Sequence, residues 1–111
     1  MRITLPHSEN FSTVFETVTG QKLLHPILGI TTDSRDVKEG DLYIALKGER
    51  VDGHSFLASV AKNGSSCALI SEPEINLDFQ QVQVKDPQET IGQIANAWRR
   101  QFNIPVIGIT G

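Results

Sequence analysis

The sequence predicts an α/β domain, in which short apolar strands alternate with amphipathic helices. Three observations carry this prediction: apolar residues at helical spacing in 8–19, the strand-like run "CALIS" at 67–71, and the helix start "DPQE" at 86–89. A chain of 111 residues is large enough for one domain with a single core. No internal repeat or low-complexity segment interrupts the alternation.

The first helix is expected at 8–19, with Ser8 as its candidate N-cap and Gly20 as its end. Its apolar residues fall at i, i+3, i+4 and i+7, so they share one face: Phe11, Val14, Phe15 and Val18. After the break at His25 and Pro26, two β-rich runs are expected at 27–32 and 42–46, joined by the polar turn "DSRDVKEG".

A second helix is expected at 55–63, ending before Gly64, with these side chains facing inward: Phe56, Leu57, Val60 and Ala61. The run at 67–71 is too short for a helix and is flanked by turn residues, so it predicts a strand. A loop at 72–79 precedes a further strand, in which Val82 and Val84 alternate with polar neighbours.

The third helix has the clearest start. Asp86 is its N-cap, Pro87 takes the first turn, where its missing N–H costs nothing, and Glu89 stands three residues after the cap. Its buried face is expected to comprise Ile91, Ile94, Ala95, Trp98 and Phe102. A closing apolar strand is expected within "IPVIGITG", residues 104–111.

Composition excludes several classes of protein. The net charge of −3 and the pI of about 5.5 do not suit a nucleic-acid binder, so no nucleic acid is expected as a partner. No segment resembles a signal peptide or spans a bilayer, so no membrane association and a cytoplasmic location are expected. The single Cys67 has no second cysteine to pair with, and we expect a small buried thiol.

Two stretches carry more polar chemistry than packing requires. In "TTDSR", 31–35, a β-run ends in hydroxyl-bearing side chains and a cation, which suits a ligand at the end of a strand, although Asp and Ser bonding their own backbone would explain the same residues. In "ALKGERVDGHSF", 45–56, Gly48 and Gly53 permit positive φ, and Lys47 and Arg50 can meet phosphate oxygens. A solvated charged loop is the alternative, and no metal role is expected for His54.

The C-terminal strand runs into Thr110 and Gly111, which is how a phosphate-binding loop begins, although the Gly-Lys-Ser/Thr that defines such a loop does not follow. Together with "TTDSRDVKEGDLYIALKGERVDGHSFL", "ALIS" and "VKDPQETIGQIANAWRRQF", this end resembles the N-terminal domain of the Mur ligases. These are the ATP-dependent amide-forming enzymes of peptidoglycan precursor synthesis. The resemblance covers residues 28–111 and carries little over 1–27.

The resemblance implies a small mixed sheet with flanking helices that holds the UDP end of a UDP-N-acetylmuramoyl-peptide. It places Thr32 and Ser34 at the uracil and ribose, and the loop of Lys47, Gly48, Glu49 and Arg50 at the nucleotide and its diphosphate. Asp52 and His54 match the family and are expected to shape the loop, while Arg35 is expected to pair with Asp41 or Glu39 as readily as with phosphate.

The resemblance also implies a division at the end of the chain. Residues 1–103 would be the UDP-sugar-binding domain, and 104–111 the first strand of, or the linker to, an ATP-binding central domain, with Thr110 and Gly111 opening its phosphate loop. ATP and Mg²⁺ would serve the full-length enzyme, which would activate a carboxylate as an acyl phosphate for attack by an amine. We expect these 111 residues alone to be catalytically inactive and to need neither cofactor.

Two members of the family share this type of domain. One adds the third residue of the stem peptide and the other adds D-alanyl-D-alanine. The combination of "DGHSF", "VKD" and "ANAWRRQF" favours the D-alanyl-D-alanine-adding member. A free-standing binding module, using the same loops for another anionic partner, remains the alternative from a different class, whereas a complete small enzyme is disfavoured because no nucleophile–base pair is visible.

Overall fold

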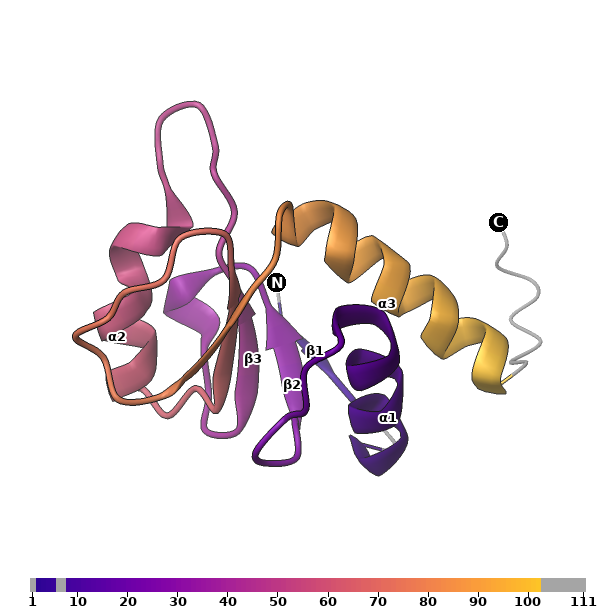
Figure 1. The fold of residues 1–111 in the computed structure, drawn as a ribbon. Helices are drawn as coiled ribbons and strands as arrows, with labels where there is room; N and C mark the ends of the chain where they lie inside the picture. Colours follow the sequence, from indigo (N-terminus) through magenta and orange to yellow (C-terminus); the bar gives the residue numbers. More distant parts are fainter. Residues whose placement is uncertain (1, 6–7, 103–111) are drawn as a thin grey trace.

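A computed structural model describes residues 2–5 and 8–102 of the chain. The elements in order are β1 (Arg2–Thr4), α1 (Ser8–Thr19), β2 (Gly29–Thr31), η1 (Ser34–Asp36), β3 (Asp41–Ile44), η2 (Gly53–Phe56), α2 (Leu57–Lys62), β4 (Cys67–Ile70), β5 (Gln80–Gln83) and α3 (Pro87–Phe102). The predicted α/β class with a mixed sheet and flanking helices is confirmed (Figure 1). Among the described residues, no helix has the length and apolar character that crossing a membrane requires.

The strands form one sheet in the order β1-β2-β3-β4-β5. The pairs β2–β3, β3–β4 and β4–β5 are parallel, whereas β1 joins the edge antiparallel to β2, with Ile3 opposite Ile30. Because the four parallel strands point the same way, their carboxyl ends meet at one edge of the domain, where ligands of open α/β sheets usually bind.

The central strands are buried on both faces, as expected for parallel strands covered by helices (Figure 1). Leu42 and Ile44 point toward the side of α1 and α3, where Phe11 packs edge-on against Trp98 at a centroid distance of 5.4 Å. Their neighbour Tyr43 points to the opposite face, toward α2. The residues of that second cluster are Val37, Tyr43, Ala45, Leu57, Val60, Ala68 and Ile70.

The helix predictions hold where local signals are strong. Helix α1 has the predicted bounds, and Gly20 ends it with φ of 75° and an N–H bonded to the Glu16 carbonyl at 2.8 Å. Helix α3 begins as predicted, since Asp86 Oδ1 accepts the amide protons of Gln88 (3.1 Å) and Glu89 (3.4 Å). The strands expected around 67–71 and 82–84 are present as β4 and β5.

Several finer expectations were wrong. The segment at 55–63 is not one helix: a 3₁₀ turn, η2, precedes the shorter α2. Phe56 is 38% exposed rather than inward, because it ends that turn and lines a pocket. On α3, Ala95 is exposed and Ala97 packs against the core instead. Strand β1 had no predicted counterpart, and the side chain of Phe102 and the closing strand at 104–111 lie outside the described residues.

Cys67 is buried, as expected, and its surroundings raise the pKa of its thiol to about 12, since the apolar interior disfavours the thiolate. A thiol in this position is a packing residue and is not a nucleophile at neutral pH.

Candidate functional site

The turn after β2 is organised by its own side chains. Thr31 Oγ1 accepts the amide proton of Asp33 at 3.0 Å, and the Asp33 carboxylate caps η1 by accepting the amide proton of Arg35 at 2.9 Å. Short polar side chains that bond the backbone two residues on favour such turns over a continued strand. The turn therefore stops β2 and presents the following side chains at the carboxyl edge of the sheet.

A pocket of about 600 Å³ opens at this edge. One side of it is the polar turn, with Thr32, Asp33, Ser34 and Arg35. The other side comes from β3 and the segment after it, and is largely apolar: Tyr43, Leu46, Val51, Gly53 and Phe56. An apolar wall facing a few hydroxyl and charged groups is the usual composition of a small-molecule site.

The segment between β3 and η2 folds back on itself as a hairpin, which projects from the body of the domain (Figure 1). Its stem is held by Gly53 N–H to Leu46 O at 2.7 Å and by a bridge between Lys47 and Asp52, and its tip by Gly48 N–H to Val51 O at 2.8 Å. We call residues 47–52 the hairpin. It places Val51, which is 55% exposed, against the pocket.

Neither Gly48 nor Gly53 adopts the positive φ that their type would permit. Gly53 is instead needed for close packing, because a Cβ there would lie 2.9 Å from both Leu46 N and the Tyr43 hydroxyl oxygen. The Tyr43 hydroxyl donates to the Gly53 carbonyl at 3.0 Å, so this glycine lets the hairpin stem lie directly on β3. The close approach at Gly53 is to the protein's own backbone.

Arg35 does not pair with Asp41 or Glu39 as expected. Its guanidinium binds Asp33, with Nη2 to Oδ2 at 3.0 Å, and these hydrogen bonds lower the pKa of Asp33 to about 2. Asp41 is already bound to Arg2, which lies on the strand that sequence reasoning missed. The side chain of Arg35 is 87% exposed and lines the pocket, so a cation with its counter-ion stands at the pocket's polar side.

The predicted site residues fall into two groups. Thr32 and Ser34 line the pocket, and their contact with a nucleotide stays a prediction. Lys47 does not line it: its ammonium pairs with Glu72, and it borders a second pocket of about 340 Å³. The remaining three, Gly48, Glu49 and Arg50, are exposed on the hairpin beside the pocket and do not line it.

Sequence reasoning missed the apolar wall of Tyr43, Leu46, Val51 and Phe56. One signal could have indicated it: Val51 and Phe56 are bulky apolar residues within an otherwise charged loop directly after a strand. Within residues 2–5 and 8–102, no group of three or more His, Cys, Asp or Glu side chains is arranged to hold a metal ion.

Comparison with known proteins assigns the chain to a family. The model of the Mur ligase family, catalytic domain, matches residues 26–99, two thirds of the chain. The chain therefore belongs to the Mur ligase family.

Among the relatives, a UDP-N-acetylmuramoyl-tripeptide–D-alanyl-D-alanine ligase of Synechocystis is 39% identical over 77% of this chain and 19% of its own length. A UDP-N-acetylmuramoyl-L-alanyl-D-glutamate–2,6-diaminopimelate ligase of Bacillus velezensis is 36% identical over 77% of this chain and 18% of its own. The chain thus spans about a fifth of the length of these curated relatives.

Solved structures give the same class. MurF from Acinetobacter baumannii superposes with a TM-score of 0.73 at 31% identity, covering 91% of this chain and 22% of that one. MurF ligase from Thermotoga maritima, in complex with ADP, has a TM-score of 0.61 at 28% identity, covering 65% of this chain and 17% of that one. Recognition of the family from its motifs is thereby confirmed.

Proposed function

We propose that this chain is the substrate-binding part of a Mur ligase that joins D-alanyl-D-alanine to UDP-N-acetylmuramoyl-tripeptide, and that it holds the UDP end of that substrate. The observation that carries the proposal is the pocket between the hydroxyl-bearing turn after β2 and the apolar wall of the hairpin and η2. Its volume of about 600 Å³ lies within the range of small-molecule sites.

The chemistry of the two walls suits a uridine nucleotide. A uracil ring has apolar faces and polar edges, so Val51 and Phe56 can cover a face while Thr32 and Ser34 hydrogen-bond an edge or the ribose. An acidic chain must hold a diphosphate by a few placed groups. We assign that role to the hairpin of Lys47, Gly48, Glu49 and Arg50, of which the last three stand beside the pocket while Lys47 pairs with Glu72 at its start, and Arg50 can bind phosphate oxygens bidentately.

The ligase activity itself is part of the proposal. The T. maritima relative is described with ADP, which supports ATP as the nucleotide of the full-length enzyme, and Mg²⁺ would neutralise the transferring phosphates. Residues 104–111 would be the first strand of, or the linker to, the ATP-binding domain, with Thr110 and Gly111 at the start of its phosphate loop. We propose that residues 1–103 form the UDP-sugar domain and that the 111-residue chain alone does not catalyse amide formation.

The proposal is tested by measuring whether the 111-residue chain binds the UDP-sugar substrate. Titrating the ¹⁵N-labelled protein with UDP-N-acetylmuramoyl-tripeptide should shift the amide resonances of 32–35 and 51–56 together, while ATP should leave them in place. Equal shifts with ATP, or none with the UDP-sugar in a folded sample, would contradict the proposal.

A second activity is favoured by one observation: the B. velezensis relative, a 2,6-diaminopimelate ligase, is nearly as similar as the D-alanyl-D-alanine ligases. The full-length enzyme would then add the third residue of the stem peptide. Assaying that enzyme with D-alanyl-D-alanine and with diaminopimelate in parallel separates the two activities, since each acts on a different UDP-muramoyl-peptide acceptor.

A further inference from the structure

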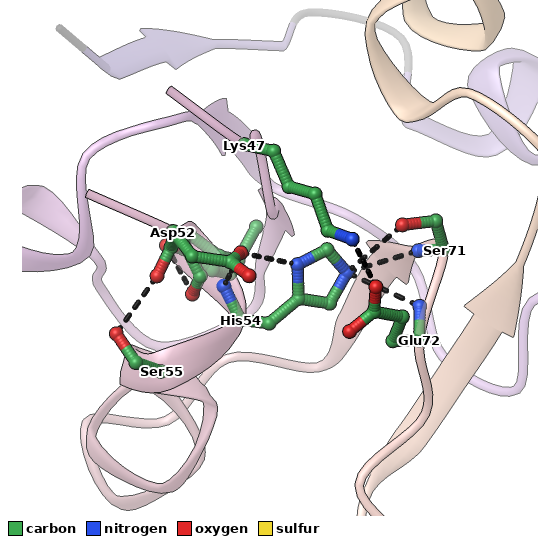
Figure 2. A network of polar contacts seen from close by, with 8 residues as sticks. Lys47, Asp52, His54, Ser55, Ser71 and Glu72 are labelled. Carbon is green, nitrogen blue, oxygen red and sulfur yellow. Dashed lines mark hydrogen bonds and ion pairs between the residues drawn. The ribbon is translucent and has the colours of Figure 1, made fainter. Parts of the chain in front are cut away.

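The imidazole of His54 joins two segments that are 17 residues apart in the sequence (Figure 2). Its Nε2 accepts the amide protons of Ser71 at 3.0 Å and Glu72 at 3.2 Å, the two residues that follow β4. A nitrogen that accepts two N–H groups carries no proton of its own. Nδ1 must then hold the ring proton, and it donates this proton to Asp52 Oδ1 at 2.6 Å.

The surroundings fix the ring in this tautomer. Its side chain is only 9% exposed, and Asp52 Oδ1 also accepts the amide proton of His54 at 2.9 Å, so the carboxylate holds both the backbone and the ring. The Ser71 hydroxyl lies 3.3 Å from Nε2. Without the imidazole, the Ser71 amide would lose its acceptor in a partly buried place, and the Glu72 amide would lose its acceptor at the surface. The partly buried loss costs more than an ordinary exposed hydrogen bond.

A second contact closes the network. Lys47, at the start of the hairpin, pairs through its ammonium with Glu72 (Figure 2). The backbone of Lys47 also forms a β-bridge with Asp52 at the hairpin's end. The stem of the hairpin is therefore attached to the end of β4 at two points, one through His54 and one through Glu72. The Lys47 pair is exposed, so it is worth little by itself, whereas the His54 ring is sheltered and its bond from the Ser71 amide is partly buried.

The elements held in this way form the apolar wall of the pocket. Gly53 and Phe56 flank His54 in η2, and Val51 precedes Asp52 in the hairpin; all three line the pocket, while His54 does not. His54 thus acts on the pocket only through the backbone on either side of it.

We propose that His54 is a positioning residue for nucleotide binding, whose neutral imidazole holds the hairpin and η2 against the end of β4, and that protonation of its Nε2 releases them. This inference rests on the proposed function of the pocket. Protonation turns Nε2 from an acceptor into a donor that faces two N–H groups, so both accepted bonds are lost, while the bond to Asp52 remains.

The charged groups around the ring do not replace this loss. Asp52 stands at Nδ1, and Glu72, beside Nε2, is engaged by Lys47. Lys85 and Asp86 line the same small pocket as Lys47 and Ser71.

Two substitutions separate the positioning role from general stability. In His54→Gln the amide oxygen can occupy the place of Nε2 and accept from Ser71 and Glu72, but it does not titrate; in His54→Asn the amide reaches only the place of Nδ1. We expect the Gln variant to bind UDP within about twofold of wild type at pH 7.5, and the Asn variant about tenfold more weakly, as for a lost pair of hydrogen bonds of which one is partly buried.

The pH dependence provides the second readout. The dissociation constant of UDP, followed by amide shifts at pH 7.5 and 5.5, should rise more in wild type than in His54→Gln. Protonation of the UDP phosphate and of the other histidines affects both proteins equally, so the ratio isolates His54. In unliganded wild type, the Ser71 and Glu72 amide resonances should move over the same pH range as the His54 ring nitrogens.

Each outcome decides a different point. The positioning role would be overturned, with the proposed function intact, if a folded His54→Asn variant bound UDP as tightly as wild type. It would also be overturned if the amide resonances of Ser71 and Glu72 did not change when His54 is protonated. No binding of UDP-N-acetylmuramoyl-tripeptide or UDP by wild type would overturn the proposed function, and the positioning role with it.

Discussion

Arg2 and Asp41 form a bidentate ion pair across β2, with Nε to Oδ2 and Nη2 to Oδ1 both at 2.7 Å, although 39 residues separate them. Gly29 makes this possible, because a Cβ there would lie only 2.5 Å from Nη2 of Arg2. Asp41 is fully buried and also accepts the amide proton of Lys38 at 2.9 Å. The pair therefore fastens the antiparallel edge strand and the turn before β3 to the same carboxylate.

Removing the cation of this pair should destabilise the domain. Arg2→Ala leaves a buried carboxylate with only backbone donors, and we expect a loss of about 2–4 kcal/mol in the free energy of unfolding, measured by urea denaturation. Gly29→Ala should act through the same contact, so the double variant should lose less than the sum of the two. Strictly additive losses would show that the two changes act separately. Arg35→Ala, which removes an exposed cation, is the matched control and should change stability little.

Substitution of Ser34 or Arg50 should weaken the binding of only one substrate of the full-length enzyme, the UDP-muramoyl-peptide. Ser34→Ala removes a hydroxyl at the polar side of the pocket, and Arg50→Ala removes the hairpin's candidate phosphate ligand. We expect either to raise the KM for the UDP-muramoyl-peptide about tenfold, as for one lost hydrogen bond to a charged or sheltered partner, and to leave the KM for ATP nearly unchanged. Equal effects on both constants would argue against the assigned roles. Lys62→Ala, on the exposed side of α2, serves as a control.

The carboxyl of Asp33 should titrate far below its ordinary range. The side-chain and backbone hydrogen bonds from Arg35 lower its pKa from 3.8 to about 2. A depressed carboxyl pKa stabilises the fold above the unfolded value, and this contribution fades as the pH falls through the folded one, here between about pH 4 and 2. In Arg35→Ala, the midpoint followed by side-chain carboxyl ¹³C shifts should return toward 3.8. An unchanged midpoint would mean that Arg35 is not the cause.

Two glycines should respond to alanine in opposite directions. Gly53→Ala places a Cβ 2.9 Å from Leu46 N and the Tyr43 hydroxyl oxygen, so it should displace the hairpin, lower the melting temperature and weaken UDP binding. Gly92 lies in α3 with no atom within 4 Å of an added Cβ. Gly92→Ala should therefore raise stability by about 0.5–1 kcal/mol through helix propensity, without altering binding. Thermal unfolding checks both, and a stable Gly53→Ala variant with normal binding would refute the packing argument.

Local signals in the sequence determined α1 and the start of α3, because spacing of apolar residues, caps and a terminal glycine act within a few turns of chain. The same reasoning identified β4 and the turn of Thr32 and Ser34, and the family motifs indicated the class. These features depend on neighbours that are near in sequence, so a pattern of letters is enough to predict them.

Only the tertiary structure decided which side chains meet. In the folded chain Asp41 pairs with Arg2 instead of Arg35, and Lys47 pairs with Glu72. Phe56, an expected core residue, forms part of a pocket wall. The tertiary structure also showed that His54 bonds the backbone after β4. Parallel pairing of strands brings segments dozens of residues apart to one edge, and charge complementarity alone does not select among several partners of like sign. The partner is decided by the folded chain, because only the tertiary structure fixes which oppositely charged side chain lies within bonding distance.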